Sequence, residues 1–139
     1  MIVNNTFSKT LDLLHRSMSA TSLRQAVYAN NISNVNSHGF KRSEVTFESE
    51  LGRALESRRH RPVLQLQQTH PDHISNWQPR DFQDVRPRRV LDFVSQVTAN
   101  GSNVDPDGEF SLLLRNQLRY MLLSQMATFE FSQVNAVLR

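Results

Sequence analysis

The sequence predicts a mainly α-helical protein in which long N-terminal and C-terminal helices pair as a coiled coil, joined by an irregular, partly disordered middle segment that can hold short β elements. Gly and Pro are absent from residues 6–35 and 109–139, whereas all five prolines lie between these stretches, four of them within residues 52–99. In both stretches apolar residues recur at steps of three and four, as on an amphipathic helix. We therefore assign residues 1–45 and 100–139 to a terminal-helix assembly domain and residues 46–99 to a basic middle segment.

The N-terminal helix carries a heptad seam. Its positions follow alternating steps of four and three: Phe7, Leu11, Leu14, Met18, Thr21, Gln25, Tyr28, Ile32 and Val35. The polar Thr21 and Gln25 lower the stability of pairing but can fix its register. The helix should end near residues 34–37, because Asn and Ser accumulate there and compete for backbone hydrogen bonds before Gly39. The stretch 40–55 alternates only partly and fits either a short strand or a second short helix.

The middle segment has no sustained periodicity from residue 52 to residue 99, which predicts irregular structure. Only the stretch 89–95 alternates, as a strand or an anchoring turn would. Eight arginines against four carboxylates between residues 53 and 89 make this region basic, whereas the flanks carry eight basic and nine acidic residues. The segment should therefore present a solvated basic loop to acidic partner surfaces.

The C-terminal helix has a clear start. Asp105 suits the N-cap, Pro106 suits the first helical position, and Asp107 and Glu109 complement the helix dipole in the first turn. Asn103 and Val104 lead into this cap. One apolar face of the helix is predicted to be an interface, formed by Leu114, Leu118, Met121, Leu122, Gln125 and Phe129. The matching N-terminal interface is predicted at Phe7, Leu11, Leu14, Met18, Tyr28 and Val35.

Several classes of function lack the residues that they need. The chain has no Cys, so disulfides, thiolate metal sites and thiol nucleophiles are excluded. It has no nucleophile elbow and no Gly-rich phosphate loop, and its carboxylates are scattered, so we expect no enzyme activity, no catalytic residues and no cofactor. His70 and His73 fit the ordering of a turn better than a metal site. The first residues lack a basic n-region and an apolar run, which predicts no cleaved signal peptide and no direct membrane insertion.

Two amphipathic helices without a conventional core make a marginal domain. At about 25 cal/mol per Å² of buried apolar surface, one antiparallel pair only narrowly offsets the ordering entropy of its own residues. The apolar faces are also wider than a two-helix seam needs. Further burial is therefore expected against neighbouring copies or partner proteins.

The stretch 29–42, ANNISNVNSHGFKR, resembles the signature of the flagellar rod and hook axial protein family. Departures from the usual pattern are Ser33, Ser37 and His38, the last in place of a Pro. Residues 100–109 and 116–120 resemble the proximal-rod members of that family, as does the short patch 69–74. The residues that carry the signature are Ala29, Asn30, Asn31, Ile32, Asn34, Asn36, Gly39, Phe40 and Lys41.

The resemblance implies a structural role in the bacterial flagellum. It implies that the terminal helices line the axis of a tubular rod in the basal body, on the periplasmic side, and that the rod transmits motor torque for motility. It implies export through the flagellar type III apparatus without a cleaved signal. The implied partners are other copies of the chain, the rod protein FlgC, the adaptor FliE and the MS-ring protein.

Two other functions compete with the axial subunit. The basic runs at 58–61 and 86–89 would suit a small nucleic-acid binder, whose binding would be strongly salt-dependent. A secretion chaperone would also need long helices, and it would stay in the cytoplasm. The axial subunit is the preferred interpretation, and no nucleic-acid partner is expected. Asn residues between 30 and 36 outnumber what helix capping needs, so we expect some of them to fix register between helices.

Overall fold

The computed structural model describes residues 2–59, 70, 80–95 and 99–138. The chain forms two compact units, Met1–Val45 with Pro87–Arg139 and Thr46–Arg86. The sequence-based division, residues 1–45 with 100–139 around a middle of 46–99, stays a prediction. The first unit contains both long helices.

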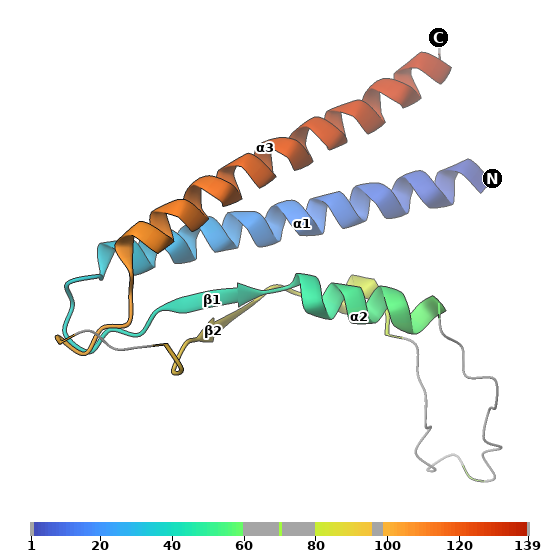
Figure 1. The fold of residues 1–139 in the computed structure, drawn as a ribbon. Helices are drawn as coiled ribbons and strands as arrows, with labels where there is room; N and C mark the ends of the chain where they lie inside the picture. Colours follow the sequence, from blue (N-terminus) through green and yellow to red (C-terminus); the bar gives the residue numbers. More distant parts are fainter. Residues whose placement is uncertain (1, 60–69, 71–79, 96–98, 139) are drawn as a thin grey trace. The chain divides into compact units, whose positions relative to one another are not determined.

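The two long helices are α1, Ile2–Ser33, and α3, Pro106–Val137, each of 32 residues. They lie side by side and antiparallel, with the chain termini at the same end (Figure 1). Near the termini the rings of Phe7 and Phe131 meet edge to face, with centroids 6.1 Å apart. Farther along, Asn116 Nδ2 donates to the carbonyl oxygen of Thr21 at 2.8 Å. The predicted mainly helical fold with packed terminal helices is confirmed.

The end of α1 is set by side chains that take its last backbone acceptors. Ser33 Oγ donates to the carbonyl of Ala29 and Asn34 Nδ2 donates to the carbonyl of Asn30, both at 2.8 Å. These bonds satisfy carbonyls that the next helical turn would otherwise use. The helix ends at Ser33, slightly before the predicted range, so the last heptad position, Val35, lies in the turn that follows.

Residues 40–55, for which the sequence predicts either a short strand or a second short helix, contain both. Strand β1 is Ser43–Thr46, and helix α2 is Glu48–Arg59. The expectation of irregular structure from residue 52 is therefore wrong for residues 52–59. Glu48 and Glu50 complement the dipole of the first turn of α2, and Gly52 costs only about 1 kcal/mol inside a helix, which is too little to end it.

The stretch 89–95 also combines its two predicted alternatives. Strand β2, Arg88–Leu91, pairs with β1 in a two-stranded sheet, and the two strands run antiparallel (Figure 1). The backbone N–H of Asp92 donates to the carbonyl of Arg42 at 2.9 Å, which extends the pairing by one residue. A turn around Asp92 follows the strand. In the second unit, a short 3₁₀ helix, η1, spans Phe82–Asp84.

Some sequence-based expectations fall on residues that the structure does not describe. Residues 60–69, 71–79 and 96–98 lie outside the described part. Of the family-like patch 69–74, which includes His73, the structure describes only His70. The side chain of His70 is exposed. Of the basic run 58–61, residues 60 and 61 lie outside the described part.

The core of the first unit is thin and contains many polar groups. Its buried apolar side chains are Leu14, Ala20, Val27, Tyr28, Val45 and Val104. More polar than apolar residues of this unit are buried: Thr21, Arg24, Asn31, Ser43, Ser102, Asn103, Glu109 and Asn116. Buried polar groups are costly unless they are hydrogen-bonded. Their partners therefore identify the most constrained part of the molecule.

Candidate functional site

Asn31 lies at the centre of a buried polar cluster at the end of α1. Its side chain is 0% exposed. Nδ2 donates to the carbonyl oxygen of Ser43 and to Glu109 Oε2, both at 2.9 Å, and Oδ1 accepts from the backbone N–H of Ser43 at 3.0 Å. One amide group therefore joins the end of α1, the start of β1 and the first turn of α3.

Arg42 and Glu109 form the charged part of the same cluster. Arg42 Nε and Nη2 both lie 2.9 Å from Glu109 Oε1, and Nη1 lies 2.6 Å from Glu44 Oε1 and 3.2 Å from Asp92 Oδ2. Burial disfavours the charged guanidinium, but the hydrogen bonds to Glu44 and Glu109 outweigh it and raise the pKa of Arg42 above its ordinary value. The guanidinium is therefore a fixed positive charge that holds three carboxylates.

Asp92 connects the cluster to the turn after β2. Its carboxylate accepts from the Ser95 hydroxyl and from the backbone N–H groups of Val94 and Ser95. These bonds, in that order, lower the pKa of Asp92 well below its ordinary value, and the Arg42 guanidinium acts in the same direction. The carboxylate is thus held in its charged form.

Asn103 completes the cluster. Its Oδ1 accepts from the backbone N–H of Arg42 at 2.7 Å, and its Nδ2 donates to the carbonyl of Asp92 at 2.8 Å. We call Asn31, Arg42, Asp92, Asn103 and Glu109 the polar clamp. The clamp fastens the chain entering β1, the chain leaving β2 and both long helices to one another.

Two glycines allow the loops beside the clamp to touch. Gly39 N–H donates to the carbonyl of Asn100 at 3.1 Å, and Lys41 Nζ donates to the carbonyl of Gly101 at 3.2 Å. Both glycines have positive φ, +69° and +82°. A Cβ at Gly101 would lie 3.4 Å from the backbone of Gly39, so a side chain there meets both backbone strain and crowding.

A second polar contact lies in the middle of the helix pair. Asn116 is buried, and its Nδ2 bonds to the carbonyl of Thr21, but its Oδ1 has no hydrogen-bond partner. An unpaired buried acceptor destabilises the folded chain by roughly 1–3 kcal/mol. A polar position of this kind in a helix–helix seam favours one register over alternatives.

The predicted interface on α3 faces away from α1. Leu114, Leu118, Met121, Leu122 and Phe129 are each more than half exposed, and Gln125 is exposed as well. At 100° per residue they lie on the side of the helix opposite the buried Glu109 and Asn116. We call these five apolar residues the outer ridge. The α1–α3 contact leaves the ridge uncovered, and its role as an interface stays a prediction.

The predicted residues on α1 are better covered. Leu14 and Tyr28 are buried, and Phe7, Leu11 and Met18 are half-buried along the seam, whereas Val35 is half-buried in the turn after the helix. An open groove of about 590 Å³ lies beside this seam. Residues lining it include Met18, Leu23 and Ala26 of α1 and Tyr120 of α3.

The signature residues divide into two groups. Asn31 lies in the polar clamp and Lys41 lies beside it, while Ile32, Asn34 and Phe40 are half-buried. Four others are exposed: Ala29, Asn30, Asn36 and Gly39. The bonds that Asn31 makes are within one chain, so the expected Asn contacts between subunits stay a prediction.

Sequence reasoning did not assign a role to Arg42, Asp92 or Glu109 in a shared cluster. Glu109 was interpreted only through its place in the first turn of a helix, and Asp92 only as part of an alternating stretch. The sequence offers one signal for this cluster. It is a carboxylate that faces the partner helix, Glu109, together with an arginine inside the signature, Arg42. Because the clamp groups satisfy one another, the arrangement fits positioning of helices. In the residues that the structure describes, no cluster of His, Asp and Glu could hold a metal ion.

Comparisons with known proteins agree with the signature. The family model for flagella basal body rod proteins matches residues 11–41. FlgB from Borreliella burgdorferi is 38% identical over 135 residues, which cover 97% of this chain and 99% of that protein. FlgB from Borrelia hermsii is 39% identical with the same coverage, and FlgB from Bacillus subtilis is 30% identical over 134 residues, 95% of each chain. All three are named flagellar basal body rod proteins.

Proposed function

The chain belongs to the FlgB family of flagellar basal body rod proteins, and on this premise we propose that it polymerises through its terminal helices within the proximal rod. Family membership makes it a structural subunit of the rod in the flagellar basal body. The finer steps concern how it packs, what it touches and how it reaches its place.

The outer ridge is the observation that carries the proposal. Its five apolar side chains remain more than half exposed although α3 is already paired with α1. Burying what remains exposed stabilises an assembly by about 1 kcal/mol per side chain, or roughly 5 kcal/mol for the ridge. Apolar stripes of this size on a small protein indicate contact with another molecule. A neighbouring subunit that packs along α3 would cover the ridge.

The polar clamp supports a role in transmitting torque. It ties the ends of both long helices to the sheet through an ion pair and several buried hydrogen bonds. A side-chain network of this kind allows one arrangement of the helices, because any displacement breaks several bonds together. The helix pair then acts as one stiff element, which a drive shaft requires.

The proposed partners and the proposed export pathway rest on the same family membership. Besides other copies of the chain, the proposed neighbours are FlgC, FliE and the MS-ring protein at the periplasmic rod base. Delivery is proposed to use the flagellar type III apparatus, with the signal in an uncleaved N-terminal region. In the described part of the chain, neither long helix is apolar enough to span a membrane. The support for these partners is the signature at residues 29–42 and the match to rod proteins over nearly the whole chain.

Leu118→Glu tests whether the ridge drives assembly. A carboxylate on the exposed side of α3 leaves the α1–α3 contact intact, so circular dichroism should show unchanged helix content. Motility and incorporation into basal bodies should be lost, because a charge cannot be buried unpaired between subunits. Mass spectrometry of purified basal bodies measures incorporation.

Asn135→Asp is the matched control, because it adds the same charge to α3 at an exposed position to one side of the ridge. It should leave motility and incorporation unchanged. If Leu118→Glu assembles as well as the unmodified chain does, the ridge is not the assembly surface. If the unmodified chain is itself missing from purified basal bodies, the proposed place in the rod is wrong.

A further inference from the structure

Strand β2 has one edge that no strand covers in the described part of the chain. The sheet has two strands, so β2 pairs only with β1. All four of its residues are exposed. Since the N–H of Asp92 points to β1, alternation in an antiparallel pair turns the backbone N–H and C=O groups of Arg89 and Leu91 toward the open edge. An edge of this kind is a template for pairing with another strand.

The end of β2 and the following turn expose an unusual amount of apolar surface. Val90 and Leu91 are about half exposed, Phe93 is 74% exposed and Val94 is 95% exposed. Four of five consecutive residues are therefore apolar and accessible. Isolated exposed apolar residues are ordinary, but a continuous group of them marks an interaction site.

The turn that carries Phe93 and Val94 is held in place by the polar clamp. The carboxylate of Asp92 accepts the N–H groups of Val94 at 2.9 Å and Ser95 at 3.1 Å, and it also contacts Arg42. The carbonyl of Asp92 accepts from Asn103. Because this backbone is fixed, the two apolar side chains are presented outward in a preformed position, which lowers the entropy lost on binding.

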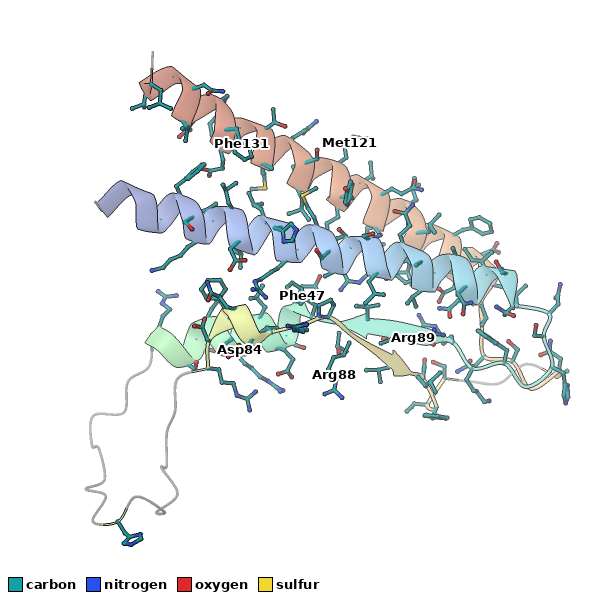
Figure 2. The ribbon with its side chains drawn as sticks, turned by 180° about the vertical axis from the view of Figure 1, so that it is seen from behind. Phe47, Asp84, Arg88, Arg89, Met121 and Phe131 are labelled. Carbon is teal, nitrogen blue, oxygen red and sulfur yellow. The ribbon has the colours of Figure 1, made fainter. Side chains whose placement is uncertain are left out.

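The beginning of the same edge is positively charged. Arg88 and Arg89 project from β2 (Figure 2), directly after Arg86 and Pro87. Arg89 Nη2 lies 3.3 Å from Asn30 Oδ1, a neutral acceptor that leaves its charge uncompensated by that bond. Pairing with β2 of a second copy would put four arginines and no carboxylate on one short ladder, and such charges on an edge strand oppose self-pairing.

We propose that the open edge of β2 binds an extended acidic segment of a partner protein by strand addition. Backbone hydrogen bonds to Arg89 and Leu91 supply affinity, and carboxylates beside Arg88 and Arg89 supply charge complementarity. Apolar side chains of the segment cover Leu91, Phe93 and Val94. This binding uses a surface separate from the outer ridge and does not depend on assembly through it.

A fluorescent peptide of alternating valine and threonine followed by three glutamates tests the proposal with the full-length chain. Fluorescence anisotropy should show saturable binding, at least tenfold weaker for a peptide that ends in three lysines. Raising the salt concentration from 50 to 500 mM should weaken binding of the acidic peptide, because the charges are exposed. Equal binding of the acidic and basic peptides, or no binding of either, would overturn the proposal.

Variants and a blocked peptide locate the contact. Arg89→Glu should weaken binding about tenfold, whereas Arg115→Glu, the same charge change at an exposed position on α3, should not. An acidic peptide with N-methylated backbone amides keeps its side chains but cannot complete the ladder, so it should not bind. Binding equal to that of the parent peptide would contradict strand addition.

Two further outcomes separate the alternatives. If the chain dimerises in sedimentation experiments and Arg89→Glu strengthens the dimer, the edge serves a second copy and the proposed acidic partner is wrong. Leu118→Glu should bind the peptide normally, because the outer ridge is not involved. Failure of peptide binding therefore leaves the rod proposal standing, and failure of rod incorporation leaves strand addition standing.

Discussion

Asn31 is fully buried in the first unit and connects its elements. Its side chain uses its acceptor and both of its donor hydrogens to join three secondary-structure elements. Its neighbour Asn30 is exposed and bonds to Arg89. Two adjacent asparagines in one signature therefore have different surroundings, and their substitutions should have different consequences.

Asn31→Ala should lower the free energy of unfolding by roughly 2–4 kcal/mol, because Ser43 and Glu109 lose buried hydrogen-bond partners together. Urea unfolding followed by circular dichroism measures this change. Asn30→Ala is the control and should change stability by less than about 0.5 kcal/mol, as exposed substitutions usually do. Equal losses from both variants would contradict the central place of Asn31 in the clamp.

Asp92 should make stability depend on acidic pH. Its pKa is lower in the folded chain than the ordinary value of 3.8, so its contribution is complete above about pH 4 and is lost as the pH falls through the folded-state pKa. Asp92→Asn should therefore be less stable than the unmodified chain at pH 7, and the difference should shrink between pH 4 and pH 2. Urea unfolding at pH 7, 4 and 2.5 gives the comparison, and a difference that stays constant would count against the assignment.

At the scale of elements, α3 is apolar on two sides. The side toward α1 contains the partly covered Leu113, Leu123 and Val134 beside the buried Glu109 and Asn116, whereas the opposite side contains the exposed Leu114, Leu118 and Met121. A helix that only needed to stabilise a two-helix unit would be apolar on its inner side alone. The second apolar side of α3 thus favours an element with two contacts, one inside the chain and one outside it.

Asn116→Leu should test what the polar seam contributes. Removing the unpartnered Oδ1 and adding an apolar side chain should leave the free energy of unfolding unchanged or raise it by about 1 kcal/mol. The seam should at the same time lose a feature that fixes its register. Urea unfolding measures the first effect, and a loss of more than 1 kcal/mol would show that Asn116 stabilises the pair instead.

Much of the element pattern could be predicted from the sequence because its signals are local. The three- and four-residue steps of α1 and the Asp105–Pro106 start of α3 depend on neighbouring residues only. The polar clamp could not be predicted in the same way, since Asn31 and Glu109 are 78 positions apart. The outward orientation of Leu114 and Leu118 was also hidden, because an apolar periodicity does not say which neighbour will cover it.

At the scale of the whole molecule, the residues of the polar clamp are not the residues at the proposed contacts. The clamp is buried and satisfied within one chain, whereas the outer ridge and the edge of β2 are exposed. The signature at residues 29–42 contributes Asn31 and Arg42 to the clamp. These two signature residues therefore hold parts of one chain together, whereas the proposed contacts with neighbours lie outside the signature.

The clamp also determines when the chain can fold. Its members follow one another from Asn31 to Glu109, so a chain that emerges N-terminus first, from a ribosome or through a narrow channel, cannot close the clamp until most of its length is free. Contacts so distant in sequence form late and slowly. Until then α1 lacks its partner helix, and an isolated helix of marginal stability unfolds easily to an extended chain. The same residues that hold the folded subunit together can thus close the clamp only after most of the chain is free.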